Sequence, residues 1–134
     1  MPVVTELTDD RNRLIAPSAP GADFVVSGRL IGLLMTQISQ NPHLTAVFGE
    51  LLAPDGNTLH LRPAAHYVRT GRTASFAAVA ASAAHQGACA IGYRSHAPTP
   101  PDDGLRINPP KAHVRYWHPE DDIVIIAPET PPAR

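Results

Sequence analysis

The stretch Pro119-Glu120-Asp121-Asp122-Ile123-Val124-Ile125-Ile126-Ala127 decides much of the fold. An acidic turn runs directly into an aliphatic stretch of five residues, a pattern typical of a buried β-strand that the chain enters from solvent. We interpret the acids at 120–122 as a solvated turn that keeps the strand end soluble. The surrounding tract, Ala88 to Pro128, adds short apolar runs separated by Pro-rich loops. It predicts a packed β module without catalytic chemistry.

Length and composition limit the possible classes of protein. With 134 residues, of which 43% are hydrophobic and 17% charged, the chain can form one globular domain, or one and a fraction. Its net charge of −1 disfavours a nucleic-acid partner, which usually requires a basic face. One cysteine, Cys89, excludes an internal disulfide and fits a reducing compartment. We expect neither a signal peptide nor direct membrane insertion, because no apolar window reaches the roughly 20 residues that a bilayer requires.

The first part of the chain predicts two strands and a helical hairpin. Val3–Leu7 and Phe24–Val26 have the composition of short strands, and Asp9–Ile15 could form one or two helical turns between them. Apolar residues then recur with helical spacing over 30–38 and 44–52, interrupted by Asn41-Pro42. The apolar stripe is wide, which indicates burial on two sides, against a parent sheet and against a partner. A domain boundary is expected near the turn at 54–57.

The second part predicts strands around one small-residue helix. Leu59-His60-Leu61-Arg62 alternates with a period of two, as a half-buried strand does, and Tyr67-Val68 continues as an extended segment. A helix capped by Thr73 or Ser75 should place Phe76, Val79, Ala80 and Ala83 inward and end at Gly87. Further strands are predicted at 88–93, 105–107, 114–117 and 123–127.

No motif for catalysis or for a metal is recognisable. The seven histidines show no H-x-x-x-H or H-x-H spacing, so we interpret them as scattered surface or half-buried residues. Cys89 lies between two alanines in an apolar run and is expected to be a buried structural thiol. Neither Asp102-Asp103 nor the acids at 120–122 form a calcium loop, and phosphate-binding glycine loops are missing. We therefore expect no enzyme, no metal and no cofactor in this chain.

Two cations are candidates for binding an anion. Arg94 stands at the end of a predicted strand, and Lys111 follows a double proline. Cations at strand ends, beside backbone amides, could hold an anionic ligand such as a nucleotide phosphate. The alternative is that both residues only make the surface soluble.

An ordered series of segments resembles the C-terminal regulatory region of Castor/Pollux-type ion channels, relatives of the regulator of potassium conductance (RCK) group. The series comprises Leu61-Arg62-Pro63, Tyr67-Val68, Ser75-Phe76-Ala77-Ala78-Val79, Ala90-Ile91-Gly92-Tyr93-Arg94, Asn108-Pro109-Pro110-Lys111 and Asp121–Ala127. The first half, with Val3–Leu7 and Ala22–Ser27, is similar to the last two strands of the RCK Rossmann half. Where the family turn usually has a Gly-Asp pair before the last strand, this chain has Asp121-Asp122.

The resemblance implies an α/β fold in two parts with a tail. A partial Rossmann-like segment with a helical crossover hairpin would occupy residues 1–54, a small βαβββ RCK C-terminal-like module residues 55–128, and a Pro-rich tail residues 129–134. The Gly-rich first unit of a Rossmann domain and the pore helices are missing, so the chain is expected to be a fragment of a longer channel-like protein. The hairpin would form the subunit contact of a homodimer or higher assembly, through Leu30, Leu34, Val47, Phe48 and Leu51.

The implied function is ligand sensing and dimerisation in the gating part of a potassium or related cation channel. The partners would be a second copy, the rest of the channel chain and a small anionic ligand, and the location would be cytoplasmic, at the membrane through the parent channel. Two alternatives remain open from the residues alone. One is a small-molecule-binding domain of a secreted or lipid-anchored bacterial protein, and the other is a metal-dependent hydrolase that uses the histidines.

Overall fold

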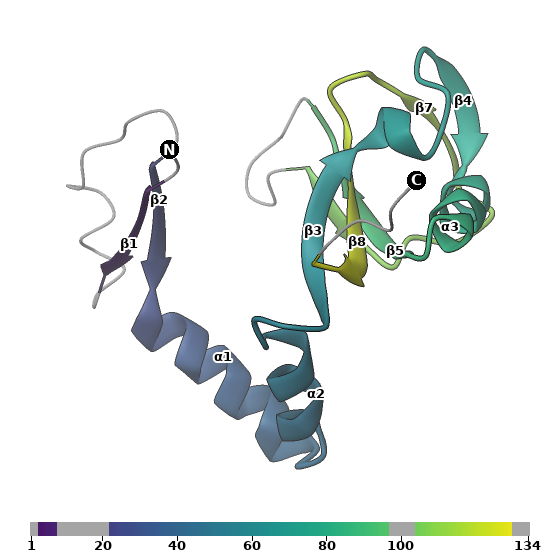
Figure 1. Ribbon diagram of the computed structural model, residues 1–134. Coiled ribbons are helices and arrows are strands. Elements are labelled where there is room, and N and C mark those ends of the chain that lie inside the picture. The colour runs from purple at the N-terminus through teal and green to yellow at the C-terminus, as the bar shows by residue number, and fades with distance from the viewer. Residues whose placement is uncertain (1–2, 8–21, 97–103, 130–134) are drawn as a thin grey trace. The chain divides into compact units, whose positions relative to one another are not determined.

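The computed structural model describes residues 3–7, 22–96 and 104–129 (Figure 1). The chain divides into two compact units, residues 1–48 and 49–134. The helical turns expected at Asp9–Ile15, the acidic pair Asp102-Asp103 and most of the Pro-rich tail lie outside the described residues. None of the described helices is long and apolar enough to cross a bilayer.

The first unit contains the two predicted strands and the helical hairpin. Strand β1 (Val3–Leu7) pairs in parallel with β2 (Ala22–Val26), and helix α1 (Ser27–Gln40) follows β2 without a break. Helix α2 (Leu44–Leu51) begins after the interruption at Asn41-Pro42, as the sequence predicts. Proline lacks a backbone N–H and fixes its φ angle, so a helix is readily broken at this point.

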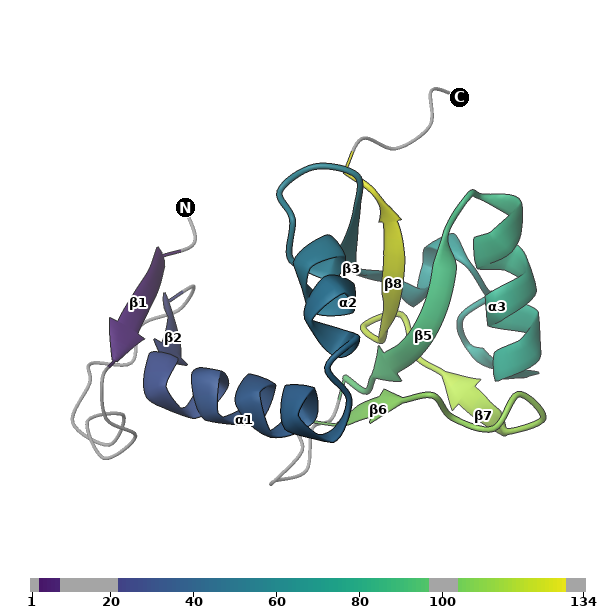
Figure 2. The same cartoon turned by 90° about the horizontal axis from the view of Figure 1, so that it is seen from below.

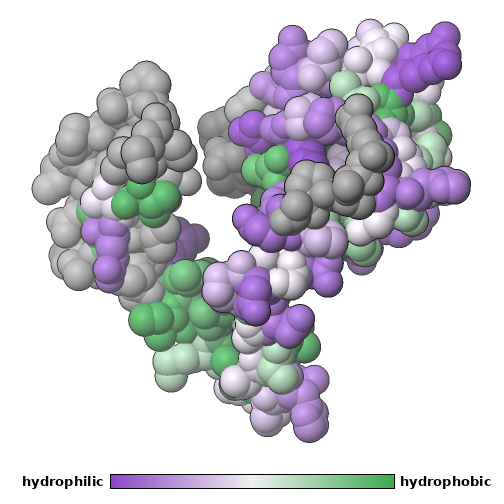
Figure 3. All heavy atoms as spheres, in the orientation of Figure 1, coloured by the Kyte–Doolittle hydropathy of each residue, from purple (hydrophilic) through white to green (hydrophobic). Residues whose placement is uncertain are grey.

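The hairpin helices leave their apolar side chains open. Among the described side chains of residues 29–48, none is buried. Leu30 is 48% exposed and Val47 is 52% exposed, while Leu34, Phe48 and Leu51 are only partly covered. Figure 3 shows the resulting hydrophobic surface over α1. These five side chains are therefore available for contact with another surface.

The second unit is built on an antiparallel sheet of four strands. The order is β3-β8-β5-β6, and the bounds are β3 Asn57–Pro63, β5 Cys89–Arg94, β6 Leu105–Ile107 and β8 Asp122–Pro128 (Figure 2). A separate antiparallel pair joins β4 (Arg72–Ser75) to β7 (Val114–Trp117). Helix α3 (Phe76–His85) follows β4 and packs beside β5. A single 3₁₀ turn, η2 (Ala64–His66), follows β3.

The core lies between the sheet, α3 and β7. Phe76 and Val79 of α3 are fully buried, together with Ile123 and Ile125 of β8 and Trp117 of β7. The Ser75 side chain accepts a hydrogen bond from the Ala78 N–H and caps α3, and Gly87, with φ of 75°, follows its C-terminal end. The prediction of a buried strand after the acidic turn is confirmed. So is the inward-facing stripe of α3: Phe76, Val79 and Ala83 are buried, and Ala80 is partly buried against the core.

Strand β3 alternates as predicted, but its leucines lie on the exposed face. Leu59 and Leu61 are 44% and 55% exposed, whereas His60 and Arg62 are partly buried. The register with β8 explains this, because His60 lies opposite Ile125 and Arg62 opposite Ile123. Residues directly opposite in an antiparallel pair share a face of the sheet, so the two polar residues share the core side.

Three further predictions are wrong. Tyr67-Val68 is not an extended segment, because Tyr67 ends the 3₁₀ turn η2 and both backbone N–H groups donate to the Ala64 carbonyl. The module is not βαβββ: the four strands predicted after the helix are all present, and a further strand, β4, precedes the helix. Cys89 is exposed rather than buried: it lies opposite Ile126 on the face of the sheet that turns away from the core.

Candidate functional site: a buried carboxylate network

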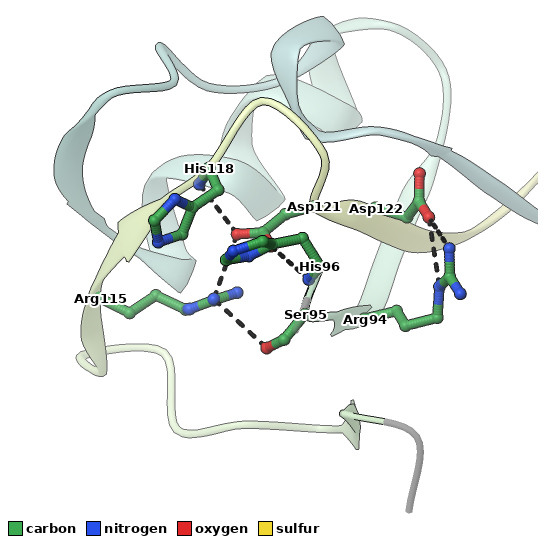
Figure 4. A network of polar contacts seen from close by, with 7 residues as sticks. All are labelled: Arg94, Ser95, His96, Arg115, His118, Asp121 and Asp122. Atoms are coloured by element: carbon green, nitrogen blue, oxygen red, sulfur yellow. Dashed lines mark hydrogen bonds and ion pairs between the residues drawn. The ribbon is translucent and has the colours of Figure 1, made fainter. Parts of the chain in front are cut away.

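A network of polar contacts centres on Asp121, the last residue before β8 (Figure 4). The turn from His118 to Asp121 is closed by a backbone hydrogen bond of 3.1 Å from the Asp121 N–H to the His118 carbonyl. The carboxylate points back into this turn, where Oδ2 accepts from the His118 N–H at 2.9 Å. Asp121 is fully buried, so the prediction of a solvated acidic turn is wrong at this residue.

The same carboxylate fixes the segment that follows β5. Oδ1 of Asp121 accepts from the His96 N–H at 2.8 Å, and the ring Nδ1 of His96 lies 3.2 Å from the same oxygen. The Asp121 carbonyl in turn accepts from the Ala64 N–H at 2.8 Å, at the start of η2. One residue therefore links three segments that are distant in the sequence.

Arg115 supplies the charge that balances Asp121. Its Nη2 lies 3.1 Å from Oδ2 of Asp121 and donates to Ser95 Oγ at 3.4 Å. Its guanidinium packs against two aromatic rings, 4.3 Å from the centroid of Tyr93 and 4.5 Å from that of Trp117. Such cation–π contacts are strongest where water is excluded. Nη1 of Arg115 is buried and has no hydrogen-bond partner among the described residues.

The network holds Asp121 in its charged form. Burial by itself raises the pKa of this carboxyl group, but it is outweighed by the backbone hydrogen bonds from His118 and His96 and by the charge of Arg115. The pKa of Asp121 therefore lies below its ordinary value. A carboxylate fixed in this way is suited to anchoring segments rather than to exchanging protons near neutral pH.

The rings of two histidines that are distant in the sequence meet beside this carboxylate. The rings of His96 and His118 have centroids 4.0 Å apart, and Tyr116 lies 4.7 Å from His118. In the part of the chain that the structure describes, no group of three His, Cys, Asp or Glu side chains could hold a metal ion. The histidine rings join the segment after β5 to the residue that follows β7.

The structure gives the two predicted ligand-binding cations separate partners. Arg94, at the end of β5, donates to Asp122 through Nη2 at 2.7 Å and Nε at 3.2 Å. Lys111 places its Nζ 4.9 Å from the centroid of the Phe76 ring. Arg94 is therefore already paired with a carboxylate, and its role in ligand binding stays a prediction, as does that of Lys111.

The chain is similar over most of its length to curated proteins named as ion channels. It is 29% identical over 126 residues to "Ion channel CASTOR" of Lotus japonicus, an alignment that covers 92% of this chain and 14% of that protein. It is 28% identical over 126 residues to "Probable ion channel POLLUX" of Oryza sativa subsp. japonica, covering 93% and 13%. For "Probable ion channel POLLUX" of Arabidopsis thaliana the identity is 27%, covering 93% and 15%. No family model matches the chain.

The resemblance to CASTOR and POLLUX ion channels is confirmed. The chain spans about one seventh of the length of these relatives, 13–15% of each, which is consistent with a fragment of a longer protein. The relatives are plant proteins, and their names describe channels rather than enzymes. A mixed α/β domain similar to part of a CASTOR or POLLUX channel is therefore what the comparisons support.

Sequence reasoning missed the central residues of the network. The sequence predicts that Asp121 lies in a surface turn with Glu120 and Asp122. Alternation along the strand, however, places Asp121 on the same side as the buried Ile123 and Ile125. Arg115 is not predicted as a site residue, because no acidic residue lies beside it in the sequence. A usable signal is that Arg115 and Trp117 are two residues apart on one strand and therefore share a face. An arginine beside buried aromatic rings often needs a carboxylate partner.

Proposed function

We propose that this chain is a regulatory domain of a potassium or related cation channel that senses a ligand and self-associates. In this proposal residues 1–54 are a partial Rossmann-like segment with its crossover hairpin, and residues 55–128 are an RCK C-terminal-like module. The similarity to proteins named CASTOR and POLLUX ion channels supports the channel context. The domain would act on the cytoplasmic side of the membrane, attached through the parent channel, without enzymatic activity.

The open hairpin is the observation that carries self-association. An isolated helix of eight residues such as α2 is marginal in water, and most helical stability in proteins comes from packing of an apolar face. Here the apolar residues Leu30, Leu34 and Val47 are half-covered or exposed. Exposed apolar patches of this kind mark interaction sites. We assign the contact to a second copy, through Leu30, Leu34, Val47, Phe48 and Leu51.

The parallel pair β1–β2 supports attachment to further chain. Parallel strands occur almost only in sheets that are covered on both faces, and two of them form a minimal sheet. Val4 in β1 is 68% exposed. We propose that the rest of the channel chain extends this sheet and covers it.

Regulation would follow from differential binding. A ligand that binds one arrangement of subunits more tightly than another shifts the population toward that arrangement, by no more than the difference in binding free energy. Arg94 and Lys111 remain the residues that we propose for a small anionic ligand within this scheme. At Arg94, such a ligand would compete with Asp122 for the guanidinium.

Light scattering over a range of protein concentrations tests the hairpin contact. We expect a dimer for the 134-residue chain, and dissociation in Leu34→Asp and in Phe48→Asp, because each places a charge in the apolar contact. Thr36→Asp is the matched control: successive helical residues turn by about 100°, so Thr36 lies on the side of α1 opposite Leu34. A chain that is monomeric at every concentration, or a control that dissociates as fully as Leu34→Asp, would contradict the proposal.

A further inference from the structure

A depression in the second unit concentrates cationic side chains. It has a volume of about 560 Å³ and borders the turn from η2 to β4, with α3 contributing one residue to its lining. Its polar side chains are those of His66, Tyr67, Arg69, Thr70, Arg72 and Ser82. Among the described residues, no Asp or Glu lines it. We call this feature the basic depression.

In the part of the chain that the structure describes, neither arginine of the basic depression is paired with a carboxylate. Arg94 and Arg115 pair with Asp122 and Asp121, respectively. By contrast, within residues 22–96 and 104–129 no carboxylate lies within ion-pair distance of Arg69 or Arg72. Within the described residues no ion pair engages either guanidinium group, and the N–H donors of a guanidinium suit an anionic ligand.

The backbone that carries these arginines is fixed on both sides. The Gly71 N–H donates to the Trp117 carbonyl at 2.7 Å, and Nε2 of Gln86, the residue that caps the C-terminal end of α3, donates to the His66 carbonyl at 2.8 Å. Gly71 has φ of 78°, a left-handed conformation that reverses the chain between Arg69 and Arg72. The two arginines therefore project from a hydrogen-bonded turn. Because this backbone is already ordered, the entropic cost of ordering it when a ligand binds is small.

We propose that the basic depression binds a small phosphate-bearing molecule. Guanidinium groups match the oxygens of phosphate with paired, charge-assisted hydrogen bonds, and the Thr70 and Ser82 hydroxyls add donors beside them. The volume lies within the range of about 300–1,000 Å³ that is typical of small-molecule sites. The chain's net charge of −1 disfavours a long polyanion in place of a small molecule. Its regulatory meaning rests on the proposed ligand sensing, while the binding itself does not require self-association.

Calorimetric titration of the 134-residue chain with ribose 5-phosphate, inorganic phosphate and ribose tests this site. We expect both phosphates to bind and ribose not to bind. Arg69→Gln and Arg72→Gln should each weaken the binding of ribose 5-phosphate about tenfold, since a hydrogen bond to a charged group contributes at least that much. Arg106→Gln is the matched control, because Arg106 is an exposed arginine of β6 that does not line the depression.

Three outcomes of the titrations would overturn the inference. They are an absence of binding by ribose 5-phosphate, equal binding of ribose, and equal weakening by Arg106→Gln, which would indicate attraction by diffuse surface charge. Amide NMR shifts on titration should be confined to residues 66–72 and the neighbourhood of Ser82, and shifts elsewhere alone would also contradict the site. Light scattering of the same samples reports self-association separately, so a failure of the hairpin dimer is distinguishable from a failure of this site.

Discussion

The guanidinium of Arg115 lies 3.1 Å from the fully buried carboxylate of Asp121 and packs against the rings of Tyr93 and Trp117. The pair joins β7 to the start of β8, next to the segment that follows β5. An ion pair in such a setting adds little by its charges alone, because both groups lose their hydration. Loss of one partner is costly, because the other charge then remains buried without compensation.

The variant Asp121→Asn should therefore destabilise the second unit strongly. The amide keeps the size of the side chain but removes the negative charge opposite Arg115 and weakens the acceptor for the His96 and His118 N–H groups. We expect the free energy of unfolding to fall by about 3–5 kcal/mol. Chemical denaturation followed by tryptophan fluorescence measures this directly, since the single tryptophan, Trp117, is in the core.

The neighbouring variant Asp122→Asn is the matched control. Its partner Arg94 is 45% exposed at the side chain, and an ion pair in contact with water contributes about 0–1 kcal/mol. Equal losses in the two variants would contradict the assignment of Asp121 as the anchoring carboxylate.

The low pKa of Asp121 predicts a specific acid sensitivity. Because the carboxyl group binds its proton less readily in the folded chain than at the ordinary value of 3.8 in the unfolded chain, acid favours unfolding. Its contribution to stability is complete above pH 3.8 and is lost as the pH falls below that value, through the lower pKa of the folded state. Unfolding free energies measured from about pH 5 to about pH 2 should decline less steeply in Asp121→Asn than in the wild type. Identical slopes would refute this origin of the acid sensitivity.

The strands and helices of this chain were largely readable from local sequence, because periodicity and turn residues act over short distances. The aliphatic run 123–127 and the stripe through Phe76 and Val79 follow from that local signal alone. Strand β4 was missed because its stability comes from pairing with β7, about 40 residues away. The alternation of β3 is local, but which of its two faces is buried depends on its register with β8, a tertiary property.

The polar network could not be predicted, because it depends on three-dimensional proximity. His96 and His118 stack although no spacing motif joins them, and Asp121 is buried although its two acidic neighbours are not. Cys89 is the opposite case, a residue that the sequence predicts to be buried and that is exposed. An apolar neighbourhood in the sequence suggested burial, but a strand alternates its faces, and this residue lies on the open one.

Gly92 should be intolerant of any side chain. A Cβ built on this residue would overlap the carbonyl oxygen of Arg106 on β6, next to the irregularity in the pairing of β5 with β8. Glycine at such a position allows two backbones to approach closely. We expect Gly92→Ala to cost about 1–3 kcal/mol of unfolding free energy, because the backbone has to shift. Gly49→Ala provides the comparison: a Cβ there meets nothing within 4 Å, and the substitution should leave the core unchanged or stabilise α2. Equal effects would show that β6 does not lie against Gly92.

The leucines of β3 lie on the exposed face of the sheet. Two aliphatic residues on the neighbouring strands β3 and β8 should therefore respond differently to substitution. Leu61 is 55% exposed, so Leu61→Ser should change the free energy of unfolding by no more than about 0.5 kcal/mol. Ile125 of β8 is fully buried in the core, so Ile125→Ala should cost about 2–5 kcal/mol through lost burial and the cavity that remains. Denaturation of the two variants under the same conditions compares them directly. If Leu61→Ser proved as costly as Ile125→Ala, the exposed face of β3 would have to be covered in solution. Repeating the measurement at several protein concentrations would then show whether a second copy provides that cover, because a dimer becomes more stable as its concentration rises.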